Sequence, residues 1–81
     1  MPNYQILLFG ICKDLLGQAT LEHVSTENLS VSDLLQALKS AHPSLDQVPS
    51  LRLAANHQFP NPDEVLFEGM EIALIPPVSG G

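Results

Sequence analysis

The 81-residue chain has few of the residue types on which metal, disulfide or nucleic-acid chemistry depends. Its single cysteine, Cys12, excludes an internal disulfide, a cysteine-rich zinc site and a four-cysteine iron–sulfur cluster. Three basic residues stand against nine acidic ones, and the formal net charge of −6 repels phosphate backbones. We therefore expect no nucleic-acid partner, and the scarcity of cysteine fits a reducing, cytoplasmic location.

Long apolar runs are also missing. Runs such as residues 6–12 fall far short of the ~20 residues that a membrane-spanning helix needs, and residues 1–5 lack the basic start of a signal peptide. We expect no membrane partner.

Metal-ligand spacing is absent as well. His23, His42 and His57 are scattered over a predicted strand, a helix end and a turn, and none has a companion cysteine. We expect no metal and no tightly bound cofactor. We interpret Cys12 as a small apolar core residue rather than a reactive thiol.

The apolar pattern predicts two strands followed by a helix. Residues 4–9 have the composition of a strand buried on both faces, residues 14–17 suggest a short turn, and residues 19–24 alternate as a half-buried strand that pairs with the first. Ser30 caps a helix, and Pro43 ends it. Its apolar stripe comprises Val31, Leu34, Leu35, Leu38 and Ala41.

The pattern in the second half of the sequence predicts three strands. After an irregular connection over residues 44–50, residues 51–55 and 58–59 suggest a hairpin that turns at Asn56 and His57, and residues 71–75 form the last strand. This order predicts an α+β, β-grasp (ubiquitin-like) fold, with a mixed sheet of about five strands on one main helix. We expect the β-grasp domain over residues 1–75 and an extended tail over residues 76–81.

That tail ends on Gly80 and Gly81, after a segment without titratable side chains. Glycine lacks a Cβ, so this dipeptide is the narrowest peptide available for entering a tunnel. Pro76 and Pro77 restrict their φ angles and favour an extended stem. A diglycine end can also be a plain frayed terminus, so the pattern needs its context.

The segment from Glu68 to Gly81, with its Pro-Pro-Val-Ser-Gly-Gly ending, resembles the small-subunit family of molybdopterin synthase, the sulfur carriers of molybdenum cofactor synthesis. The resemblance continues through residues 8–10, 13–17, 31–38 and 54–56, and therefore along most of the chain. Lys13, Met70 and residues 74–75 depart from the family pattern, in which arginine, an acidic residue and aromatic residues are frequent.

The resemblance implies that Gly81 carries the chemistry and that Gly80 gives it access. A ubiquitin-activating-like adenylyltransferase uses ATP to adenylate the Gly81 carboxylate, and a sulfur donor enzyme converts the adenylate into a thiocarboxylate. The loaded tail then gives its sulfur to cyclic pyranopterin monophosphate in the synthase large subunit, within an expected heterotetramer, and the chain alone is inert. The implied partner-binding residues are Phe9, Lys13, Phe59, Ile75, Pro76, Pro77, Val78 and Ser79.

Two alternatives remain. The chain is a sulfur carrier of another pathway, for thiamine or for protein modification, although the Pro-Pro stem and the length argue against the thiamine carrier. Otherwise it is a β-grasp interaction module without chemistry at its tail. Deletion of Gly80 and Gly81 distinguishes these, because an interaction module keeps its function without them.

Overall fold

The computed structural model describes residues 1–77. Along the chain, its elements are β1 (Asn3–Leu8), α1 (Gly10–Leu16), β2 (Thr20–Val24), α2 (Val31–Ala41), the 3₁₀ helix η1 (Pro43–Gln47), β3 (Arg52–Ala55) and β4 (Ile72–Ile75). No helix within these residues is long and apolar enough to cross a bilayer.

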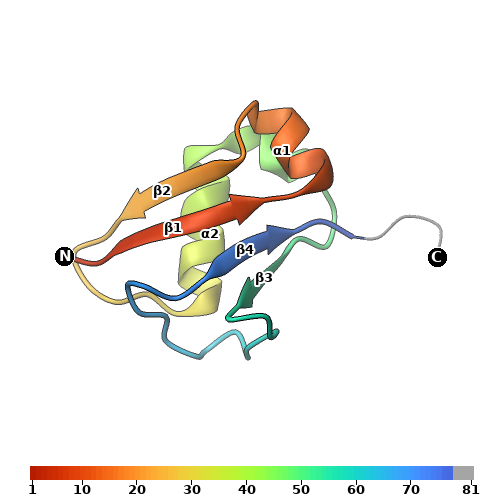
Figure 1. Ribbon diagram of the computed structural model, residues 1–81. Helices are drawn as coiled ribbons and strands as arrows, with labels where there is room; N and C mark the ends of the chain where they lie inside the picture. Colours follow the sequence, from red (N-terminus) through yellow and green to blue (C-terminus); the bar gives the residue numbers. More distant parts are fainter. Residues whose placement is uncertain (78–81) are drawn as a thin grey trace.

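The four strands form one mixed sheet in the order β2-β1-β4-β3. β1 pairs parallel with β4, and the outer pairs, β1 with β2 and β3 with β4, are antiparallel. Figure 1 shows α2 crossing one face of this sheet and α1 standing at the end where β1 finishes. The β-grasp prediction is confirmed, with four strands instead of about five.

The core lies between the sheet and α2. Ile6 pairs with Ile72, Leu8 with Leu74, and Leu74 with Leu53, so these side chains share the face that α2 covers. The buried set is Tyr4, Ile6, Leu8, Cys12, Leu21, Val31, Leu34, Leu38, Leu45, Val48, Leu51, Leu53, Ala55, Leu66, Ile72 and Leu74. Burial of so much apolar surface supplies most of the driving force for folding.

The prediction that the first strand is buried on both faces is wrong. Gln5 is exposed and Leu7 is only half-buried, while Tyr4, Ile6 and Leu8 are buried. The strand also ends at Leu8, so Phe9 lies outside it. The physical reason is the single layer of helix: a sheet covered on one side leaves its other side open.

Two connections are more ordered than the sequence suggested. The predicted turn over residues 14–17 is the end of α1, where Gly17 takes a φ of 68° and its N–H donates to the Lys13 carbonyl at 2.9 Å. The predicted irregular segment after Pro43 begins as η1. Both helices are short, so neither has the repeated apolar period from which a helix is predicted; Cys12 and Leu45 anchor them in the core.

Helix α2 matches the prediction closely. Ser30 Oγ accepts a hydrogen bond from the Asp33 N–H at 3.1 Å, which satisfies one of the free donors of the first turn. The stripe is buried at Val31, Leu34 and Leu38. Only the expected end of the stripe is wrong: Ala41 is exposed, because it lies in the last turn beyond the edge of the sheet contact.

The predicted turn at Asn56 and His57 is confirmed, but the strand after it is not. Both residues have positive φ values, 50° and 68°, and Ala55 and Gln58 exchange backbone hydrogen bonds across the turn. Beyond this isolated bridge the chain leaves the sheet, and β3 pairs instead with β4. This accounts for the missing fifth strand.

The buried Tyr4 hydroxyl links two loop segments, at Leu29 and Leu66, and its removal tests how much these hydrogen bonds contribute to stability. The hydroxyl donates to the Leu66 carbonyl and accepts from the Leu29 N–H, each at 2.8 Å. Tyr4→Phe leaves both groups without this partner, so we expect a loss of about 2–4 kcal/mol in the free energy of unfolding. Urea titration measures it; a loss below about 0.5 kcal/mol would show that water replaces the hydroxyl.

Candidate functional site

The face of the sheet opposite α2 is apolar at its centre. Leu7, Ala73 and Ala54 lie in register across β1, β4 and β3 and point away from the core. Within residues 1–77 neither helix covers this face (Figure 1). A hollow of about 290 Å³ lies there, lined by Leu7, Phe9, Ala54, His57, Phe59, Glu71, Ala73 and Ile75.

The structure brings together three residues that the sequence proposed for partner binding. Phe9, Phe59 and Ile75 all line this hollow, although they come from the end of β1, a loop and β4. Phe9 is 47% exposed and Phe59 is 52% exposed. Exposed aromatic side chains on an apolar surface are typical of protein–protein contacts, and we name this surface the open sheet face.

The turn after β3 holds Phe59 at this position. The Asn56 N–H donates to the Glu71 carbonyl at 2.8 Å, and the Glu71 N–H donates to Asn56 Oδ1 at 2.9 Å. On the rim, His57 Nε2 lies 2.9 Å from Glu71 Oε2. Arg52 stacks on Phe59, with its guanidinium carbon 4.0 Å from the ring centroid. The loop therefore meets the sheet through specific contacts.

Sequence reasoning missed several of these residues. Leu7, Ala54 and Ala73 form the floor of the hollow, and His57 and Glu71 form its rim. Small alanines carry no signal of function, and strand register cannot be read from one sequence. The positive φ expected at Asn56 predicted the turn, but it did not predict the hydrogen bonds between Asn56 and Glu71.

The tail begins next to the open sheet face. Pro76 follows β4 and is half-buried, and Pro77 is exposed. Val78, Ser79, Gly80 and Gly81, the other tail residues proposed from the sequence, lie outside the described residues. Lys13 is exposed on α1 and does not line the hollow, so the structure places it apart from the three apolar candidates.

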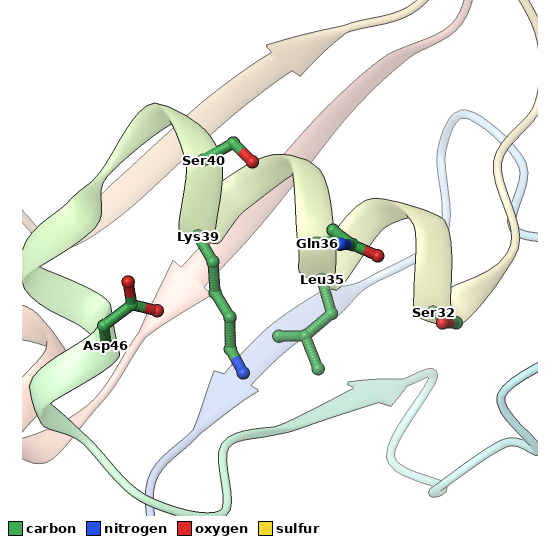
Figure 2. A pocket seen from close by; sticks show the side chains of 6 residues that line it. All are labelled: Ser32, Leu35, Gln36, Lys39, Ser40 and Asp46. Atoms are coloured by element: carbon green, nitrogen blue, oxygen red, sulfur yellow. The ribbon is translucent and has the colours of Figure 1, made fainter.

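A larger hollow, of about 460 Å³, lies along α2. Figure 2 shows its lining, with Leu35 and Lys39 projecting from the same side of the helix and Asp46 across from them. Apart from Leu35, the lining is polar; the others are Ser32, Gln36, Lys39, Ser40 and Asp46. It pairs no nucleophile with a base, so its size alone does not make it a reaction site.

Cys12 is fully buried, in agreement with the interpretation from the sequence, and burial raises the pKa of its thiol above the ordinary value. The pKa of the Cys12 thiol is higher in the folded protein than the value of ~8.5 in the unfolded chain. The protonated thiol therefore contributes fully to the free energy of unfolding below pH ~8.5, and this contribution is lost as pH rises through the folded-state pKa. We expect the unfolding free energy of the wild type to fall more steeply above about pH 8.5 than that of Cys12→Ala.

Chemical denaturation of both proteins across this pH range measures the difference. In the same protein, a maleimide reagent at neutral pH is expected to label Cys12 only after denaturation. Rapid labelling of the native protein would contradict the buried, protonated thiol and would reopen a role for Cys12 in sulfur loading.

The described part of the chain, residues 1–77, contains no cluster of three or more His, Cys, Asp and Glu side chains that could hold a metal ion.

The fold and site define a class: small β-grasp proteins with an open apolar sheet face and a carboxyl-terminal diglycine. The chain belongs to the ThiS family, whose model matches residues 6–81. It is similar to a protein of Chlamydomonas reinhardtii named molybdopterin synthase sulfur carrier subunit, at 32% identity over 95% of this chain and 96% of the relative. The resemblance noted in the sequence is thereby confirmed.

Solved structures agree on the fold. SAMP1 from Haloferax volcanii, a small archaeal modifier protein, superimposes with a TM-score of 0.81 at 30% identity, over 98% of this chain and 99% of that one. A chain in a complex of subunits 1 and 2 of the molybdopterin-converting factor from Helicobacter pylori matches with a TM-score of 0.67 at 22% identity, over 98% and 99%. At that identity the second likeness supports the fold alone.

Proposed function

We propose that this chain is the cytoplasmic sulfur carrier subunit of a molybdopterin synthase, with Gly81 as the sulfur-bearing residue. The observation that carries the proposal is the position of the open sheet face. β1 and β4 are parallel neighbours, so Phe9 and Pro76, which follow them, lie at the same end of the sheet, and Phe9 lines the open sheet face. A partner that binds this face is then placed to receive the tail.

The chemistry follows from the poor reactivity of a carboxylate. A Gly81 carboxylate oxygen attacks the α-phosphorus of ATP in an activating enzyme, and pyrophosphate leaves. The sulfur donor supplies hydrosulfide, which attacks the acyl carbon of the mixed anhydride; AMP leaves, and loss of the S–H proton gives the thiocarboxylate. Activation is needed because the free carboxylate is a poor electrophile, and the product sulfur is a good nucleophile. ATP is therefore a substrate of the partner and not a cofactor of this chain.

The proposed partners are a synthase large subunit in a heterotetramer, an adenylyltransferase and a sulfur donor. The name of the Chlamydomonas relative supports the first of these. The net charge of −6 favours encounter with basic partner surfaces. In this proposal the large subunit supplies the groups that bind and activate the pterin.

A second candidate is a protein modifier, favoured by the similarity to SAMP1 at 30% identity. A modifier is adenylated in the same way, but its Gly81 ends in an amide bond with a lysine of another protein. The two functions therefore share activation and differ in the acceptor.

Intact-mass spectrometry after incubation with ATP, the matched activating enzyme and a sulfur source tests the proposal. We expect one terminal oxygen to be replaced by sulfur. Addition of the large subunit and cyclic pyranopterin monophosphate should then return the unmodified mass together with molybdopterin. An unchanged mass in the first step contradicts the carrier function, and covalent conjugates to other proteins favour the modifier.

A further inference from the structure

Pro76, the first residue of the tail stem, packs against the backbone of Gly10. The chain turns from β1 into α1 at this glycine, with a φ of +54°, a left-handed value that side chains disfavour. A Cβ built on Gly10 would lie 3.3 Å from Cγ of Pro76, which is closer than an ordinary van der Waals contact. Parallel pairing of β1 with β4 produces this approach, because both strands finish at the same end of the sheet.

The other described glycines differ from Gly10 in one respect. Gly17 and Gly69 also have positive φ values, +68° and +92°, but a Cβ on either would meet nothing within 4 Å. Backbone conformation alone accounts for glycine at those two positions. At Gly10 the neighbouring Pro76 ring adds a second requirement, and this ring belongs to the tail stem.

We propose that Gly10 is a positioning residue for the tail: its bare backbone seats Pro76 and so sets the direction in which the chain leaves β4. The inference rests on the proposed carrier function. It adds a residue outside the tail that acts on sulfur loading through Pro76 and not through contact with the reacting atoms.

The effect is large because Pro76 is stiff and is far from the reacting carbon. A Cβ at 3.3 Å requires the Pro76 ring to move by a few tenths of an ångström, and because the ring is closed on its own backbone nitrogen, part of that movement passes to the backbone of the stem. Five residues follow Pro76 up to Gly81, which allows a reach of at most about 17 Å. A misplacement of about 1 Å at a reacting group can cost about a hundredfold in rate.

The test compares Gly10→Asn with Gly17→Asn. Asparagine tolerates positive φ better than most residues, so both variants carry a similar backbone cost, and only the first introduces a side chain beside Pro76. We expect Gly10→Asn to lower kcat for ATP-dependent sulfur loading about tenfold, with KM for the carrier within about twofold because the open sheet face is intact. Gly17→Asn should load at the wild-type rate.

Two further measurements separate positioning from loss of structure. The amide shift of Ile75 and the Hα shifts of Ile75 and Pro77 should move in Gly10→Asn and not in Gly17→Asn, with similar melting temperatures for both. In a double-mutant cycle, Gly10→Asn should add little to the effect of Pro76→Ala, because the Cγ that it meets is already gone. Gly10→Ala serves as the second variant if the asparagine does not fold.

Equal loading rates for the two asparagine variants, or additive effects of Gly10→Asn and Pro76→Ala, would overturn the proposal that Gly10 positions the tail through Pro76. A wild-type protein that gains no sulfur overturns the proposed function instead, together with any role of Gly10 in loading. In that event, unchanged shifts at Ile75 and Pro77 would also overturn the contact itself.

Discussion

Replacing Gly81 with alanine is expected to lower sulfur loading and transfer by at least about a hundredfold while leaving the fold intact. The added methyl group lies directly beside the acyl carbon, which the sulfur nucleophile attacks in the adenylate and which bears the nucleophilic sulfur in the thiocarboxylate. It also widens the tip and removes backbone conformations that only glycine reaches. Because the reacting carbon is on the substituted residue itself, no rearrangement elsewhere can restore the geometry.

Stability should not change in Gly81→Ala, because the buried core of the described residues lies between Tyr4 and Leu74. Intact-mass spectrometry of the loaded protein gives the loading rate, and circular dichroism with urea titration checks the fold. Gly69→Ala is the control for the loading rate only: its methyl group would meet nothing within 4 Å, but a φ of +92° strains alanine, so we expect lower stability with loading at the wild-type rate.

A folded Gly81→Ala protein with full sulfur transfer would rule out the tail chemistry. Deletion of Gly80 and Gly81 gives the complementary result. The carrier loses all sulfur transfer on deletion, whereas a β-grasp interaction module retains partner binding and whatever function depends on it.

Phe59→Lys is expected to weaken binding to the synthase large subunit by about thirtyfold or more, the level of an interface hot spot. Phe59 lies on the open sheet face and is 52% exposed, so in the free protein a lysine there keeps its charge in water. On docking, the ammonium group would be buried against an apolar surface without a partner, which is costly. Arg52, which stacks on the native ring, adds repulsion.

The matched control is Phe67→Lys. Phe67 is 50% exposed, nearly the same as Phe59, but does not line the hollow beside the tail. Both variants gain the same charge and lose the same ring, so isothermal titration calorimetry with the large subunit isolates the position. Equal affinities for the two variants would remove Phe59, and with it the open sheet face, from the docking surface.

The sequence was sufficient for the elements with a clear local signal. The apolar period and the Ser30 cap located α2, and the tolerance of Asn56 for positive φ located the turn after β3. It was insufficient for α1 and η1, which are too short to show a period and depend on Cys12 and Leu45 packing into the core. The expected fifth strand failed because the chain leaves the sheet after the isolated bridge between Ala55 and Gln58, although the outer edge of β3 is open.

The candidate site likewise contains features with a local sequence signal and features without one. The diglycine end and its proline stem are visible in the sequence because their chemistry is local: a narrow tip, restricted φ angles and a terminal carboxylate. Phe9, Phe59 and Ile75 were named there as partner-binding residues through the family resemblance. Their place around one hollow results from strand register and from the anchoring of the Asn56 turn on Glu71.

By itself, then, the sequence determined the helix that covers one face and the residue proposed to carry sulfur, since each depends on neighbours within a few positions, and the order of its elements along the chain indicated the β-grasp class. Only the tertiary structure decided which face of the sheet stays open and that Gly10 lies against Pro76. These depend on the parallel pairing of β1 with β4, which joins residues more than sixty positions apart and has no local signal.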